Sequence, residues 1–139
     1  ELQYIEQMTK YMHPATTVFD IGANVGVWTK ILSRAVGSNG KVLTFEPIES
    51  TFQILKQQCS HLKNVYLFQK ALSNENGVKQ IYIDPTSAAP PDASINETAK
   101  HINDLRVQKL VMIPIEVARL DDLSLPIQGR VSFMKIDVE

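Results

Sequence analysis

The pattern that most constrains the fold of this chain is an alternation of short apolar runs with longer amphipathic segments. The runs TTVFDI, KVLTFE and NVYLFQ, at 16–21, 41–46 and 64–69, are rich in β-branched and aromatic residues and predict buried strands. Between them, apolar residues recur at helical spacing over 25–36 and 48–62, which predicts two amphipathic helices. Strands that alternate with helices of about a dozen residues indicate right-handed βαβ units in a parallel sheet.

The segments on either side of this core follow other patterns. The spacing over 2–12 predicts an N-terminal helix that Pro14 ends, and 71–84 predicts a β-hairpin that turns near Asn76–Gly77. The Pro, Ala and Ser residues over 85–94 predict a loop.

Four features describe the rest of the chain. Residues 96–105 fit either a short helix or a loop, and the strand-like segment 109–120 contains Pro114, which places it at an edge or a bulge. The acids Asp121–Asp122 are typical of a helix start, and 130–139 predicts a last, largely buried strand.

These elements predict one Rossmann-like α/β domain over 1–139, a doubly wound, mostly parallel sheet with flanking helices and an inserted β-hairpin. The chain begins with Glu1 and stops within the apolar segment KIDVE. We therefore expect a C-terminally incomplete domain, truncated after its fourth core strand, in which VSFMKIDV is an exposed apolar edge prone to association.

Composition excludes several classes of protein. With 14 basic and 15 acidic residues the chain has no excess of positive charge for a nucleic acid or a polybasic membrane surface, and no apolar run approaches the length of a membrane span. Cys59 is the one cysteine, so an internal disulfide is impossible and a reducing, cytoplasmic location is the default. The three histidines share no metal-ligand spacing, so no metal is predicted; the oligomeric state is left open.

The stretch VFDIGANVG joins the first predicted strand to the first predicted helix. Ligands of such sheets bind beyond the carboxyl ends of the strands, where the strand order reverses. Gly22 would let the backbone turn tightly and approach a ligand, and Gly26 would let the helix pack against the strand. The free N–H groups of the turn and of the helix N-terminus favour a polar or anionic group.

Two residues of this turn discriminate between cofactors. Asn24 stands where the G-x-G-x-x-G motif has the glycine that admits a pyrophosphate, which weakens the case for a dinucleotide. Asp20 would repel phosphates but suits a ligand that carries an ammonium group. A nucleoside with an amine and a cation in place of phosphates is S-adenosylmethionine.

A second acid ends the next predicted strand. Glu46 is placed to accept hydrogen bonds from both hydroxyls of a ribose, and Pro47 suits the first turn of the helix that follows. Either motif alone is also common in ordinary strand-to-helix turns. Their occurrence on consecutive strands favours a nucleoside-cofactor site.

With these motifs in place, VFDIGANVG, FEP, ALS and LDDL followed by FMKIDVE resemble the FkbM-type methyltransferases of the class I S-adenosylmethionine-dependent superfamily, over 17–139. The resemblance implies a Rossmann-like sheet, S-adenosylmethionine as cofactor, and methyl transfer to a hydroxyl oxygen. It implies a sugar, a glycan or a natural-product intermediate as the small-molecule or glycan acceptor.

The resemblance also assigns site residues. The matching positions, in chain order, are Asp20, Gly22, Ala23, Asn24, Glu46, Lys70, Ala71 and Asp137. Those before residue 25 match the motif beside the methionyl part, Glu46 the ribose-binding acid, and Lys70–Ala71 the segment that borders adenine. Asp137 matches the acid that ends the fourth strand near the methyl group, where it is the candidate catalytic residue. Lys135, two residues earlier on the same strand, should point to the same face as Asp137.

Two other functions stay open at this point. One is a nicotinamide-dependent oxidoreductase on a similar sheet, and the other is a non-catalytic, cofactor-binding remnant that acts as an interaction module. Trp28 and Cys59 lie on the apolar faces of their helices and are predicted to belong to the core. Ser94 is predicted to cap a loop.

Overall fold

The computed structural model describes residues 7–84, 93–94 and 110–138. The first half of the chain contains β1 (Thr17–Ile21), α2 (Val27–Val36), β2 (Lys41–Phe45), α3 (Glu49–Cys59) and β3 (Val65–Phe68), which confirms the predicted strand–helix alternation. Residues 7–9 are helical, as predicted, and the prediction for residues 2–6 lies outside the described ranges.

The second half contains shorter elements, named here in chain order. They are β4 (Ala71–Leu72), β5 (Gly77–Ile83), β6 (Ala93–Ser94), β7 (Val111–Ala118), the 3-10 helix η3 (Leu120–Asp122) and β8 (Val131–Ile136). The first turn of η3 holds Asp121 and Asp122, which confirms the predicted helix start. Ser94 lies in strand β6, opposite Tyr82, where a loop was predicted. The predictions for 85–92 and 96–105 lie outside the described residues.

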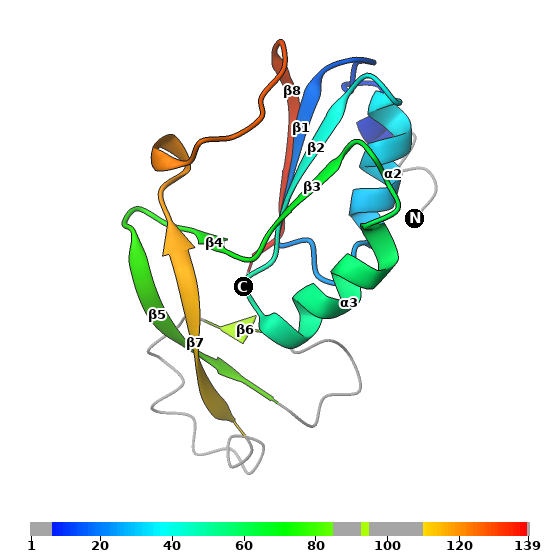
Figure 1. The fold of residues 1–139 in the computed structure, drawn as a ribbon. Coiled ribbons are helices and arrows are strands. Elements are labelled where there is room, and N and C mark those ends of the chain that lie inside the picture. The colour runs from blue at the N-terminus through cyan, green and yellow to red at the C-terminus, as the bar shows by residue number, and fades with distance from the viewer. Residues whose placement is uncertain (1–6, 85–92, 95–109, 139) are drawn as a thin grey trace.

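The first sheet consists of four parallel strands in the order β3-β2-β1-β8 (Figure 1). β1 pairs with β2 along its whole length on one side and with β8 on the other. The chain therefore builds outward from β1 to β3 and then returns to add β8 beside β1. This order confirms the Rossmann-like, mostly parallel fold.

Alternation along the strands gives the sheet two apolar faces. On one face, Val18 and Val42 pack with Leu32 and Val36 of α2, and Figure 1 shows α2 and α3 on this side. On the other face, Phe19, Ile21, Leu43 and Phe45 pack together, and Leu120, Leu123 and Leu125 cover them. Within the described residues, a connecting segment thus takes the place of a helix on the second face.

The second sheet has the order β4-β7-β5-β6. β5 runs antiparallel to β7 over its full length, whereas β4 pairs in parallel with the last two residues of β7. The predicted hairpin over 71–84 is therefore wrong, because β7 lies between β4 and β5. Asn76 gives the physical reason: its side chain accepts a hydrogen bond from the Arg119 backbone N–H at 2.8 Å and donates to Asp122 at 2.7 Å. These hydrogen bonds hold the segment that was predicted to turn, at Asn76, against the chain that follows β7.

The predicted position of Pro114 agrees with this sheet. Pro114 lies opposite Gln80 of β5, in a part of β7 that β4 does not reach. Within the described chain it therefore has a strand on one side only, which is where proline is tolerated.

β8 is less buried than predicted. Among its six residues only Lys135 is buried, and Val131, Met134 and Ile136 are exposed, as is Val138 beyond it. The reason is position: among the residues that the structure describes, β8 is the edge strand of the first sheet and pairs with β1 alone. The expectation of an exposed apolar edge at VSFMKIDV is thus met, and the association expected from it stays a prediction. Among the described residues, no helix combines the length and the apolar character needed to cross a bilayer.

Candidate functional site

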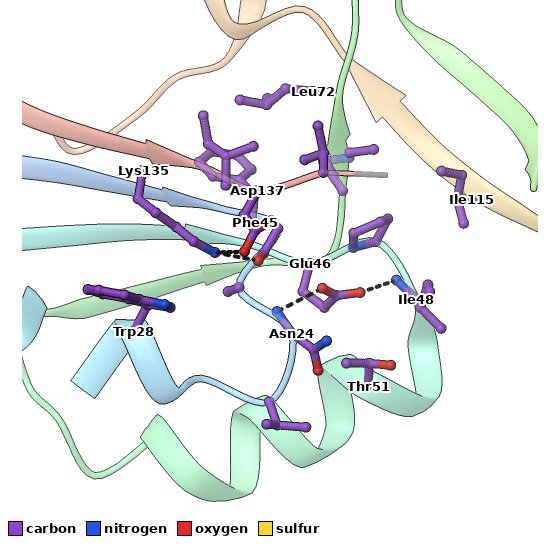
Figure 2. Close-up of a pocket in the computed structure, with 18 of the residues that line it drawn as sticks. Asn24, Trp28, Phe45, Glu46, Ile48, Thr51, Leu72, Ile115, Lys135 and Asp137 are labelled. Atoms are coloured by element: carbon purple, nitrogen blue, oxygen red, sulfur yellow. Dashed lines mark hydrogen bonds and ion pairs between the residues drawn. The ribbon is translucent and has the colours of Figure 1, made fainter. Parts of the chain in front are cut away.

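The carboxyl ends of β1, β2 and β8 meet at one edge of the sheet, and a cavity of about 500 Å³ opens there (Figure 2). This is the place where the strand order reverses between β1 and β8, the usual ligand site of such sheets. Of the predicted site residues, the cavity is lined by Gly22, Ala23, Asn24, Glu46, Pro47, Lys70, Ala71 and Asp137. The structure thus brings together residues that lie up to 115 positions apart, from Gly22 to Asp137.

The turn after β1 is held closely against its neighbours. The backbone N–H groups of Gly22 and Ala23 both donate to the Phe45 carbonyl at 3.0 Å. Gly22 has φ +74°, and a Cβ added there would lie 2.0 Å from the Asp137 carbonyl oxygen. Asn24 has φ +52°, a left-handed conformation that asparagine tolerates better than most residues. Glycine at position 22 therefore leaves room for the chain segment that follows β8. It also lines the cavity.

Gly26 lies behind the cavity and does not line it. A Cβ on Gly26 would lie 2.7 Å from Leu55 and 2.8 Å from Cys59, both on α3. Its packing partner is therefore α3, where the sequence suggested the strand. Cys59 is fully buried in that cluster, which confirms its predicted core role.

Glu46 organises the end of β2. Its side chain is 5% exposed, and its two oxygens accept hydrogen bonds from the backbone N–H groups of Asn24 and Ile48, both at 3.0 Å. Burial raises the pKa of this carboxyl above its ordinary value, although the two N–H groups act in the opposite direction. Each carboxylate oxygen can accept more than one hydrogen bond, so Glu46 keeps acceptor capacity toward the cavity.

Asp20 is placed differently from its sequence interpretation. It is fully buried and does not line the cavity. Its Oδ2 accepts the Thr29 hydroxyl at 2.6 Å, and its Oδ1 lies 3.4 Å from the Lys135 ammonium. The ammonium group that faces Asp20 thus belongs to the protein. Burial raises the pKa of the Asp20 carboxyl, while Thr29 and Lys135 act to lower it.

Lys135 joins three acceptors at the end of β8. Its Nζ donates to the Gly22 carbonyl at 2.9 Å and lies 3.5 Å from Asp137 Oδ2, besides its ion pair with Asp20. The Lys135 side chain is 9% exposed and that of Asp137 is 73% exposed, and both line the cavity. The predicted shared face of Lys135 and Asp137 is confirmed. Figure 2 shows the Lys135 and Asp137 side chains together, and the Glu46 side chain between Asn24 and Ile48.

Sequence reasoning missed several lining residues. Trp28 was predicted to be core, but it is half-buried and lines the cavity, because the buried face of α2 is formed by Thr29, Leu32, Ser33 and Val36. Its position two residues after Gly26 could have indicated this. Ile81 and Ile115 of the second sheet also line the cavity, and only the tertiary structure brings β5 and β7 there. Lys70 forms an ion pair with Glu116 of β7.

The described residues contain no group of three or more metal-ligating side chains. The residues that define the site are its carboxylates, a buried lysine and the backbone N–H groups of two tight turns, at the open end of a parallel sheet. These features define a Rossmann-like protein with a candidate cofactor cavity at the switch point.

Comparison with known proteins gives the family. The sequence profile of the methyltransferase FkbM domain matches residues 20–139, so the chain belongs to the FkbM methyltransferase domain family, as the sequence motifs indicated. No curated protein matches the chain.

Three solved structures to which the chain is similar carry the name of a methyltransferase. The chain is similar to an S-adenosylmethionine-dependent methyltransferase from Aquifex aeolicus, with 27% identity and a TM-score of 0.45, over 51% of this chain and 38% of that one. It is similar to an S-adenosylmethionine-dependent O-methyltransferase from Thermotoga maritima, with 17% identity and a TM-score of 0.43, over 60% and 43%. A precorrin-6y C5,15-methyltransferase from Geobacter metallireducens has 8% identity and a TM-score of 0.41, over 82% and 85%. The chain thus spans about two fifths of the length of the first two structures.

Proposed function

We propose that this chain binds S-adenosylmethionine and serves a methyltransferase that acts on a hydroxyl oxygen of a sugar, a glycan or a natural-product acceptor. The observation that carries the proposal is the cavity at the ends of β1, β2 and β8, with the buried Glu46 carboxylate beside a tight turn and an ion pair nearby. The family supports methyl transfer. The choice of a hydroxyl acceptor rests on the resemblance to the FkbM type.

The residues of the cavity fit the chemistry of this cofactor. Its volume of about 500 Å³ lies within the range of small-molecule sites. Glu46 has oxygens left to accept from ribose hydroxyls, and Lys70 and Ala71 are assigned to the border of the adenine.

The chain's own residues would act mainly by positioning. S-adenosylmethionine, when bound, supplies a methyl group on a sulfonium centre, which is a good leaving group. Alignment of acceptor and methyl group can therefore provide much of the acceleration. Asp137 is the candidate catalytic residue, because it is exposed in the cavity and its carboxylate lies beside the Lys135 ammonium. The oxygens of the Asp137 carboxylate can accept hydrogen bonds, so this residue is suited to orient a hydroxyl or an amine of a ligand.

The binding step has a direct test. We expect the full-length protein to bind S-adenosylmethionine and S-adenosylhomocysteine, but not NAD, because the Gly22–Gly26 turn lacks the glycine that admits a pyrophosphate. Isothermal titration calorimetry with the three ligands measures this. Binding of NAD with no binding of S-adenosylhomocysteine would contradict the proposal and favour the oxidoreductase alternative. Cofactor binding without turnover of any acceptor would favour the interaction module.

The catalytic step is tested at Asp137. We expect Asp137→Asn to lower turnover by about tenfold to hundredfold without abolishing it, as a lost positioning contact of roughly 1.4–2.7 kcal/mol would. The matched control is Asp121→Asn, which removes the same charge from an exposed position in η3 and should leave turnover unchanged. Steady-state assays with an acceptor give the comparison. Complete loss of turnover with intact cofactor binding would make Asp137 an essential base, and unchanged turnover would leave it a structural role.

The raised pKa of Glu46 predicts that folding stability and cofactor affinity change in opposite directions with pH. Because burial raises its pKa above 4.5, the folded chain holds a proton that the unfolded chain has already released in the window between the two values. At pH values above the raised pKa, the ionised, buried carboxylate therefore lowers the free energy of unfolding by its full amount. This effect disappears as the pH falls below 4.5. As the pH falls through the same window, the affinity for S-adenosylhomocysteine should decrease, because protonated Glu46 is a poorer hydrogen-bond acceptor.

Two measurements check these trends. Chemical denaturation from about pH 4 to about pH 7 gives the free energy of unfolding, and calorimetry over the same range gives the affinity. In Glu46→Gln, which has no proton to release, the part of both trends that Glu46 contributes should be missing. Identical pH profiles in the wild-type protein and in Glu46→Gln would show that Glu46 has no raised pKa.

A further inference from the structure

The cavity is closed at one end and open at the other. Its exposed lining residues come from the segment between β1 and α2 and from the chain after β8, and they are Asn24, Val27, Asp137 and Val138. The lining residues from 45–72, β5 and β7 are buried or half-buried. Among the described residues, the end of the cavity at α2 and β8 is therefore the open one, and a second ligand meets it first when the cofactor is already bound.

The proposed cofactor would place its nucleoside in the closed end. Its ribose is assigned to Glu46 and its adenine to Lys70–Ala71, all of which lie among the buried or half-buried lining residues. Figure 2 shows Trp28 and Lys135 on one side of the cavity and Ile48 and Ile115 on the opposite side. Trp28 thus lies at the end that the nucleoside leaves free.

Trp28 offers an aromatic surface at this open end. The residue is half-buried and lines the cavity. Phe45 also lines the cavity, but it is 1% exposed and stacks on Phe68 with ring centroids 4.8 Å apart, so it belongs to the core. The helical turn that carries Trp28 is held in place by the next residue, because the buried Thr29 hydroxyl donates to Asp20 at 2.6 Å. Among the described lining residues, Trp28 therefore has the aromatic ring that a ligand can reach.

An indole ring near a carboxylate suits the two surfaces of a sugar ring. One face of a pyranose can consist mainly of C–H groups, which pack on an aromatic ring because both surfaces are apolar. The hydroxyls at the edge of the same sugar then stay free to donate to a carboxylate. Asp137 lines the same end, and its side chain is 73% exposed. Lys135 already has three acceptors around its ammonium, so it is assigned no contact with this ligand.

We propose that Trp28 binds the methyl acceptor: its indole ring packs against the apolar face of a sugar ring, while Asp137 orients one of the sugar hydroxyls. The assignment rests on the proposed function, because the cofactor in the closed end leaves this end to the acceptor. It makes Trp28 a residue that decides which acceptors bind and that does not hold the cofactor.

Sugar binding is tested on the full-length protein with the cofactor site filled. Calorimetry first gives the affinity for S-adenosylhomocysteine. Saturation-transfer difference NMR of that complex then uses the methyl glycosides of glucose, galactose, mannose and rhamnose, with benzyl alcohol as a flat aromatic alcohol for comparison. We expect at least one glycoside to receive saturation, most strongly at the C–H groups of one ring face, and its titration gives a dissociation constant.

Variants of Trp28 separate the acceptor from the cofactor. In Trp28→Leu, which loses the ring but stays apolar, the glycoside should bind about tenfold more weakly. Trp28→Phe keeps a smaller ring and should lose less. Both variants should bind S-adenosylhomocysteine as the wild-type protein does, which also shows that they are folded. Tyr11→Leu is the control, since it removes an aromatic ring that is 70% exposed and does not line the cavity.

A second measurement needs no folded Trp28→Leu. Trp28 is the one tryptophan of the sequence, so the glycoside should change a fluorescence signal that Trp28→Phe lacks.

Each outcome decides the inference. Weaker glycoside binding in Trp28→Leu, with unchanged affinity for S-adenosylhomocysteine, supports it. Glycoside binding at wild-type strength in Trp28→Leu overturns it, as does a complex that binds none of the glycosides or prefers benzyl alcohol to all of them. An equal loss of affinity for S-adenosylhomocysteine also overturns it, because Trp28 would then be a wall of the cofactor site. A wild-type protein that does not bind S-adenosylhomocysteine contradicts the proposed function itself, and the inference falls with it.

Discussion

Replacing Glu46 with alanine should weaken S-adenosylhomocysteine binding by about tenfold to hundredfold, because charge-assisted hydrogen bonds of roughly 1.5–3 kcal/mol to the ribose are lost. The same change should lower the free energy of unfolding. In the folded chain, the Glu46 carboxylate accepts the N–H groups of Asn24 and Ile48, both at 3.0 Å, and alanine leaves both donors without that partner. An unpaired buried donor costs about 1–3 kcal/mol, so a stability loss of about that size should accompany the loss of affinity.

The two effects can be separated by calorimetry and by chemical denaturation of the same variant. Glu49→Ala is the matched control, since it removes the same side chain three residues later from an exposed position in the first turn of α3. It should leave the affinity unchanged. Unchanged affinity in Glu46→Ala would remove Glu46 from the site, even if the variant were less stable.

Gly22→Ala should be among the most damaging single changes in this domain. A Cβ at this position would lie 2.0 Å from the Asp137 carbonyl oxygen and 2.9 Å from the Asp137 carbonyl carbon, both backbone atoms that cannot rotate away. The residue also has φ +74°, which costs a non-glycine residue about 1 kcal/mol. To relieve the contact, the ends of β1 and β8 must separate, and overpacking of this kind typically costs a further 1–3 kcal/mol or so.

We therefore expect Gly22→Ala to lower the free energy of unfolding by about 2–4 kcal/mol and to abolish cofactor binding at ordinary ligand concentrations. The binding loss follows because Gly22 lines the cavity, so a turn displaced by the contact with Asp137 deforms the site. Gly129→Ala is the control: φ at Gly129 is +63°, but a Cβ there meets nothing within 4 Å. In Gly129→Ala the free energy of unfolding should fall only by the cost of the positive φ, about 1 kcal/mol. Equal losses in the two variants, measured by urea denaturation, would show that the contact with Asp137 is relieved at no cost.

These predictions share a physical origin, because β1, β2 and β8 all end at the same edge of the sheet. The Gly22 turn, the Glu46 carboxylate and the Lys135 ammonium hold one another through backbone groups: Phe45 accepts from the turn, Glu46 accepts from Asn24, and Lys135 donates to Gly22. A change in one of them should therefore disturb the others. Double-mutant cycles between Glu46 and Lys135 should show non-additive losses of cofactor affinity.

The local pattern of the sequence was sufficient for the core of the fold. The first three predicted strands and the two helices predicted between them occur at their expected places, and the strand predicted at the end of the chain lies beside the first. The reason is that periodicity reports which face of an element is buried, and the βαβ connection has one favoured hand. The end of each parallel strand then places Gly22, Glu46 and Asp137 at the same edge without further information.

Tertiary contacts decided what periodicity does not encode. The hairpin assigned to 71–84 was wrong because strand pairing depends on partners far along the chain, here Arg119 and Asp122, which bind Asn76. Trp28 and β8 were predicted to be more buried than they are, because an apolar residue has the same local pattern whether it faces the core, a cavity or an open edge.

The clearest division lies at Asp20. The sequence by itself determined that a carboxylate stands near the end of β1, just before the glycine turn, and its interpretation was that this acid faces the ammonium group of a ligand. Only the tertiary structure decided which cation, since Lys135 lies 115 positions away and reaches Asp20 through the pairing of β1 with β8. A buried charge is stabilised by whichever opposite charge the fold brings within a few ångströms, and that distance is set by strand order, which no local pattern records.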